Sequence, residues 1–147
     1  MTGFTHLHTV SGFSLRYGAS HPEQLARSAA ARDMAALALT DRDTLGGAVR
    51  FADACEEAGI RPLFGVELAV AEPTGGAGGP AVRRRTPVRG GAFIDESAPR
   101  TVFLARDGAT GWADLCRLVT TAHAAGTSGP LLPWQDNHGT GVAVLLG

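Results

Sequence analysis

Short apolar runs alternate with stretches of helical spacing along most of this chain of 147 residues. Five apolar runs have the length of buried β-strands, and they lie at 3–9, 35–41, 61–71, 101–106 and 141–147. Three stretches place apolar residues three and four positions apart, which predicts helices at 20–34, 44–59 and 110–126. The alternation favours an α/β fold with parallel strands and outer helices, as an open sheet or part of a barrel.

The length fits one domain over residues 1–147. The formal net charge is −1, so no global positive field marks the chain as a nucleic-acid binder. Two separated cysteines, Cys55 and Cys116, are typical of free thiols in a reducing compartment. No secretory signal and no apolar run of membrane-spanning length is visible. We therefore expect a cytoplasmic protein without a membrane partner.

Residues 72–100 interrupt the alternation with a segment dense in Gly, Pro and Arg. The segment is too long for an ordinary connection and too polar to pack, which predicts a flexible surface insertion. A loose hairpin around Val82 and Phe93 is compatible with its few apolar residues. The run Arg83–Arg85 fits either a solvated loop or a phosphate contact.

Polar side chains gather where the expected strands end. The first strand carries His6 and His8, which two-residue spacing would place on one face. The second ends at Asp41, Arg42 and Asp43, and the third carries Glu67. Active sites of parallel α/β folds form at these strand ends. Imidazole and carboxylate groups there suit a divalent metal ion, although strand-capping polar residues are the alternative.

Four ordered stretches now point to a family. "FTHLHTVSGFS", "ALALTDRDTLGGAVRF", "AGIRPLFGVEL" and "LARDGATGWADLCRLVTTAH" resemble the polymerase and histidinol phosphatase (PHP) domain. They are most similar to the PHP domain that begins the alpha subunit of bacterial DNA polymerase III, a C-family polymerase. The resemblance implies a distorted strand–helix barrel. This chain would supply the N-terminal part of it, with about five strands and three main helices.

The resemblance also implies metal ligands at His6, His8 and Glu67. Three positions depart from the family pattern: a carboxylate position is Tyr17, and two histidine positions are Arg42 and Arg100. A guanidinium keeps its proton and repels a nearby cation, so we expect a degraded metal site. The resemblance then leaves room for no cofactor, or at most one Zn, Mn or Mg ion.

Four residues, Asp41, Arg42, Tyr17 and Arg100, are candidates for filling the vacated site or contacting phosphate. Arg42 in particular could pair with Glu67 or Asp41 and hold the strand ends together. We name no catalytic residue in this chain, since the polymerase carboxylates of the family have no counterpart in it.

Three functions follow from these expectations. The first is a non-catalytic scaffold or docking module of a polymerase that serves DNA replication or repair synthesis. Its partners would be the remainder of an alpha subunit and replisome proteins, with DNA met only through the parent chain. The second is a metal-dependent phosphoesterase or 3′–5′ exonuclease. The third is a free-standing protein that binds a phosphorylated ligand through Arg42 and Arg100.

Overall fold

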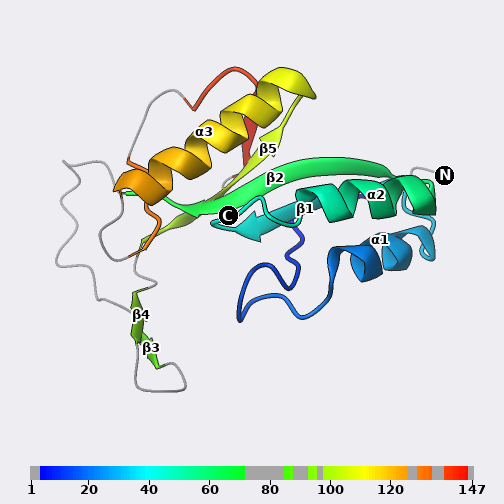
Figure 1. The fold of residues 1–147 in the computed structure, drawn as a ribbon, viewed down its shortest axis with the longest axis horizontal. Helices are drawn as coiled ribbons and strands as arrows, with labels where there is room; N and C mark the ends of the chain where they lie inside the picture. The colour runs from blue at the N-terminus through cyan, green and yellow to red at the C-terminus, as the bar shows by residue number, and fades with distance from the viewer. Residues whose placement is uncertain are drawn as a thin grey trace.

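The computed structural model describes residues 4–71, 85–87, 93–95, 98–125, 129–133 and 138–145. Within these ranges, four strands form one sheet with the order β1-β2-β5-β6, and β3 pairs with β4 in a separate hairpin (Figure 1). The strands are β1 (Ala36–Arg42), β2 (Arg61–Ala69), β3 (Arg85–Pro87), β4 (Phe93–Asp95), β5 (Arg100–Ala105) and β6 (Val142–Leu145). The helices are α1 (Pro22–Ala30), α2 (Ala48–Ala58) and α3 (Ala109–Ala125). The predicted α/β class with three helices is confirmed.

Local sequence signals explain where the helices begin and end. α1 begins at Pro22, and the backbone N–H of His21 donates to Gln24 Oε1 at 3.1 Å. His21 and Gln24 therefore cap the first turn of this helix. α2 ends at Gly59, whose φ of 69° is a conformation that glycine adopts without strain.

All three helices pack on one face of the sheet. Leu37 and Leu39 of β1 lie beneath α1 and α2 in one core cluster, whereas Val66 of β2 and Phe103 of β5 lie beneath α3 in another. Side chains at alternate positions point the other way. The helix-free face therefore carries a separate small cluster centred on Ala38, Val102 and Leu104.

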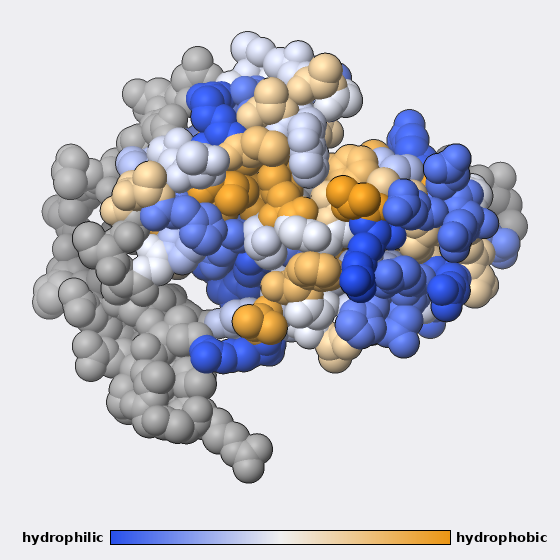
Figure 2. Space-filling view, viewed as in Figure 1, coloured by the Kyte–Doolittle hydropathy of each residue, from blue (hydrophilic) through white to orange (hydrophobic). Residues whose placement is uncertain are grey.

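Phe64 of β2 packs against both core clusters beneath the helices. Its ring makes edge contacts with Phe51 of α2, at 6.2 Å between ring centroids, and with Trp112 of α3, at 5.9 Å. A groove of about 250 Å³ remains between the two helices, and Val49 at its margin is 72% exposed. Figure 2 shows hydrophobic residues gathered in the hollow between α3 and α2.

The expectation of parallel strands holds for β1 with β2 and is wrong for the other pairings of this sheet. β5 runs antiparallel to β2, and β6 runs antiparallel to β5. The segment after α3 explains the second reversal. Leu131 bonds back to Ala122 near the end of α3, but Gly141 already bonds to Arg106 beside its start. The chain has retraced the length of α3, so β6 begins beside the end of β5 and runs opposite to it.

The expected first strand at 3–9 is also wrong, because residues 4–10 lie along β1 without forming a regular strand. The carbonyls of His6 and Thr9 accept from Ala38 N–H at 2.9 Å and Thr40 N–H at 2.8 Å. The two accepting residues are three positions apart in the N-terminal segment, whereas the two donors are two positions apart in β1. One extra residue in the N-terminal segment is the mismatch that defines a β-bulge. Such a mismatch breaks the two-residue alternation on which the pairing of His6 with His8 depended.

The inserted segment is only partly described. β3 and β4 form a short hairpin within it, with Thr86 opposite Ile94, and Figure 1 shows this hairpin apart from the four-stranded sheet. Val82 and Arg83 lie outside the described residues. The sheet resumes at Arg100, so the predicted boundary of the insertion at residue 100 falls inside β5. Among the described residues, no helix has the length and apolar character needed to cross a membrane.

Candidate functional site

Strand register brings the departing family positions together on the helix-free face. Arg42 at the end of β1 pairs directly with Glu67 of β2, and Arg100 begins the neighbouring strand β5 opposite Ala69. Alternation puts Arg42, Glu67 and Arg100 on the same side of the sheet. We call these residues with His8, Tyr17 and Asp43 the Glu67 cluster.

The carboxylate of Glu67 is shared by three basic groups. Arg100 Nε donates to Oε1 at 2.6 Å, and Arg42 Nε lies 3.2 Å from the same oxygen. His8 Nε2 lies 3.2 Å from Oε2. The side chain of Glu67 is only 11% exposed, so water screens these contacts weakly. The expected pairing of Arg42 with Glu67 is what the structure contains.

Arg42 is held between Glu67 and an aromatic ring. Its Cζ lies 3.5 Å from the centroid of the Tyr17 ring, a cation–π arrangement. Burial and the neighbouring positive charge of Arg100 lower the pKa of Arg42 from its ordinary value, against the opposing effect of Glu67 and Asp43. Tyr17 therefore covers a guanidinium at the position where the family pattern has a carboxylate.

Asp43 extends the cluster toward α3. Arg100 Nη2 donates to Asp43 Oδ1 at 2.8 Å and to the Glu67 backbone carbonyl at 3.0 Å. His123 Nε2 of α3 donates to the Asp43 carbonyl at 2.7 Å. Asp43 has a φ of 60°, a strained value for a non-glycine residue. Sequence reasoning gave His123 no role here, because 80 residues separate it from Asp43.

Asp41 does not join the Glu67 cluster. It points to the opposite face of β1 from Arg42 and is 1% exposed. Its carboxylate accepts from Ser11 N–H at 2.6 Å, Ser11 Oγ at 2.8 Å and Ser14 Oγ at 2.6 Å. Three donors satisfy the buried charge and tie the loop after the N-terminal segment to β1. Of the two partners expected for Arg42, Glu67 is the one for which an ion pair is seen.

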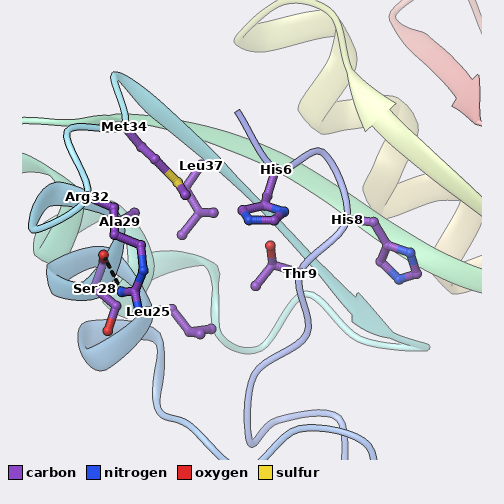
Figure 3. Close-up of a pocket in the computed structure, with 9 residues that line it drawn as sticks. All are labelled: His6, His8, Thr9, Leu25, Ser28, Ala29, Arg32, Met34 and Leu37. Carbon is purple, nitrogen blue, oxygen red and sulfur yellow. Dashed lines mark hydrogen bonds between the residues drawn. The ribbon is translucent and has the colours of Figure 1, made fainter. Parts of the chain in front are cut away.

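His6 lies apart from His8 and Glu67. Its ring contacts Phe4 edge-on at 4.7 Å between centroids, and it lines a cavity beside α1. Figure 3 shows the His6 ring near Leu37 and the His8 ring farther from Leu37, although both residues line that cavity. The structure thus brings together two of the three predicted ligands, His8 and Glu67. Ligation of metal by His6, His8 and Glu67 stays a prediction.

Permanent cations lie against the carboxylate of Glu67. An ion on Glu67 Oε1 would meet Arg100 at hydrogen-bond distance and Arg42 beside it, and neither guanidinium can lose its proton. Within the described part of the chain, no group of three or more His, Cys, Asp or Glu side chains is arranged to hold an ion. The Glu67 cluster joins the N-terminal segment, β1, β2 and β5 through charge-assisted contacts.

Comparisons with known proteins place these observations. The PHP domain family model matches residues 6–144. The error-prone DNA polymerase of Mycolicibacterium paratuberculosis is 42% identical over 123 residues, covering 84% of this chain and 10% of the polymerase. The DNA polymerase III subunit alpha of Caulobacter vibrioides is 31% identical over 149 residues, covering 99% of this chain and 12% of that subunit.

A solved structure also resembles the fold. It is an amidohydrolase from Chromobacterium violaceum with bound sulfate and no metal, 29% identical, with a TM-score of 0.54. The match covers 82% of this chain and 33% of that one. This chain therefore spans about a tenth of the polymerase relatives and a third of the structural relative.

Proposed function

Because this chain belongs to the PHP domain family, we propose that it is the PHP module of a bacterial polymerase of the DNA polymerase III alpha or error-prone type. The polymerase relatives support this, since they match 84% and 99% of its residues. The chain spans only 10% and 12% of their lengths. Under the proposal, nucleotide addition belongs to the rest of a longer chain, and DNA is met only through that chain in the cytoplasm.

The proposal further holds that the module is not itself a catalyst. The observation that carries this is the pairing of Glu67 with Arg100 and Arg42, at 2.6 Å and 3.2 Å. A hydrolytic site built on metal-activated water needs carboxylate and imidazole groups that are open to the ion. Here permanent cations hold the carboxylate instead.

A scaffold role suits the connections that the Glu67 cluster makes. His8, Arg42, Glu67 and Arg100 come from four segments of the chain, and Asp43 adds the contact to α3 through His123. Joining these segments fixes the end of the sheet as one rigid surface. Such a surface would support the polymerase body or a replisome partner without any bound ion.

Metal content and hydrolysis test the non-catalytic part of the proposal together. The chain is purified without chelator, dialysed against Mn²⁺ or Zn²⁺, and freed of loosely bound ions before elemental analysis. Hydrolysis of bis-p-nitrophenyl phosphate and of a single-stranded oligonucleotide is then measured. We expect less than one tightly bound ion per chain and no hydrolysis above the blank, because the guanidinium groups occupy the carboxylate.

The variants Glu67→Gln and His21→Gln provide the comparison, since His21 is an exposed histidine outside the cluster. Several ions per chain, with hydrolysis lost in Glu67→Gln and kept in His21→Gln, would instead establish the metal-dependent phosphoesterase or exonuclease.

A further inference from the structure

A second site lies on the helix-covered side of the sheet, and its lining meets the Glu67 cluster at His8. It is a cavity of about 310 Å³ between residues 6–9, α1 and the first residues of β1. Figure 3 shows Arg32 and Ser28 on the α1 side and His6 and Thr9 on the side of the N-terminal segment. The volume is at the lower end of the range for small-molecule pockets, roughly 300–1,000 Å³. It suits a ligand about the size of one substituted aromatic ring.

The walls of this cavity are mainly apolar. Leu25 and Ala29 contribute from α1, Leu37 from β1, and Met34 from the turn between them. The methionine side chain adapts to irregular shapes and makes favourable contacts with aromatic rings. These walls favour a compact apolar body, and a flat ring in particular.

Arg32 supplies the permanent charge at this cavity. Arg32 is exposed, and its Nη1 donates to the Ser28 carbonyl at 2.9 Å, which holds the guanidinium at the rim of the cavity. His6 and the Ser28 hydroxyl are further hydrogen-bonding groups there. Among the described residues that line the cavity, none is acidic. This local excess of positive charge stands out in a chain whose formal net charge is −1.

We infer that this cavity binds a small amphipathic anion, with an apolar ring against Leu25, Leu37 and Met34 and a carboxylate or phosphate group at Arg32. The remaining guanidinium N–H groups of Arg32 would donate to the anion, a charge-assisted contact of the strong kind. The inference does not depend on the proposed function. A polymerase module could carry this site or lack it.

Titration of the ¹⁵N-labelled chain followed by NMR tests the inference with four probes. Phenyl phosphate and phenylacetate carry a ring and an anion, 2-phenylethanol carries the ring alone, and inorganic phosphate carries the anion alone. We expect saturable shifts of the amide signals of Ser28, Arg32 and Leu37 with at least one ring-bearing anion. The alcohol and inorganic phosphate should bind roughly tenfold more weakly, the factor expected for losing one charged contact or the ring. Tighter binding of phenyl phosphate or of phenylacetate shows whether the site prefers a phosphate or a carboxylate group.

Arg32→Gln and Arg27→Gln form the matched pair of variants, since Arg27 is an exposed arginine of α1 outside the cavity lining. Arg32→Gln should bind the anions about as weakly as the wild type binds the alcohol, and Arg27→Gln should bind them unchanged.

Three results would overturn the inference. The first is equal binding of the alcohol and the anions, and the second is the absence of saturable binding up to about 10 mM, a threshold near the weakest specific affinities. The third is a concentration-dependent dimer that shifts the same signals without any probe, which would assign the cavity to a second copy of the chain.

Discussion

At the residue scale, Glu67 holds two cations that would otherwise repel each other. The contact with Arg100 Nε at 2.6 Å is a short charge-assisted hydrogen bond. Arg42 Nε approaches the same oxygen at 3.2 Å but is not aligned for a hydrogen bond, so this contact is an ion pair. Both guanidinium groups are largely buried, with side chains 13% and 21% exposed. The carboxylate therefore contributes more than either arginine alone.

Glu67→Ala is expected to destabilise the chain by roughly 3–5 kcal/mol, the range for removing one partner of a buried ion pair. The loss leaves Arg42 and Arg100 close together without their shared counter-charge. Arg42→Ala should cost less, about 1–2 kcal/mol, because Arg100 still pairs with the carboxylate. Urea unfolding followed by circular dichroism measures both values.

Arg27→Ala is the control, since it removes an exposed arginine, and it should change the free energy of unfolding by less than about 0.5 kcal/mol. Arg42→His restores the residue of the family pattern and should be less harmful than Arg42→Ala. If Arg42→Ala behaves like Arg27→Ala, the ion pair contributes nothing and Arg42 is an ordinary surface residue.

At the element scale, local patterns predicted the core strands and the three helices, but not how the strands run. β1, β2 and α3 lie within a few residues of the predicted ranges, because hydrophobic spacing and capping signals act over short distances. Strand direction depends on where a long connection returns. The path from α3 back to Gly141 leaves no local signature, so the reversal of β6 could not be predicted from its apolar residues.

The start of α3 and the entry to β6 approach so closely that both need glycine. A Cβ added to Gly141 would lie 2.6 Å from the backbone nitrogen of Gly111, too close for either backbone to tolerate. Gly141→Ala should therefore cost about 1–3 kcal/mol, the usual range for overpacking, by forcing β6 away from α3. Thermal unfolding of this variant and of Gly108→Ala measures the effect.

Gly108→Ala is the matched control, because nothing lies within 4 Å of a Cβ at that position. It should be neutral or slightly stabilising, since alanine restricts the unfolded chain. Equal melting of the two variants would mean that β6 does not need the close approach.

At the scale of the whole molecule, the resemblance to a family predicted more of the candidate site than the spacing of residues did. Tyr17, Arg42 and Arg100 were identified because they stand at family ligand positions, and the fold brings all three near Glu67. Spacing failed for His6, because one extra residue against β1 turns it toward the cavity beside α1. The contact between His123 and Asp43 could not be predicted, since only the packing of α3 on the sheet creates it.

The long segment at 72–97 interrupts the chain between two neighbouring strands of the four-stranded sheet. β2 and β5 are antiparallel neighbours, and Val70 N–H bonds to the Pro99 carbonyl at 2.9 Å. The two ends of the segment are therefore already adjacent, as at the base of a hairpin. A short turn such as Asn-Gly connects strands in this arrangement.

Replacing residues 73–96 with such a turn should leave the sheet intact and the free energy of unfolding equal or slightly higher. Each halving of a flexible loop lowers its closure cost by roughly 0.6 kcal/mol. The design keeps Ala98, Pro99 and Arg100, so the contact of Arg100 with Glu67 at 2.6 Å is preserved. Thermal and urea unfolding compare it with the intact chain, and a second version that also substitutes Arg100→Ala serves as the control. That version should lose stability, because Glu67 loses its shortest contact. A shortened chain that fails to fold with Arg100 in place would show that the segment is part of the structural core.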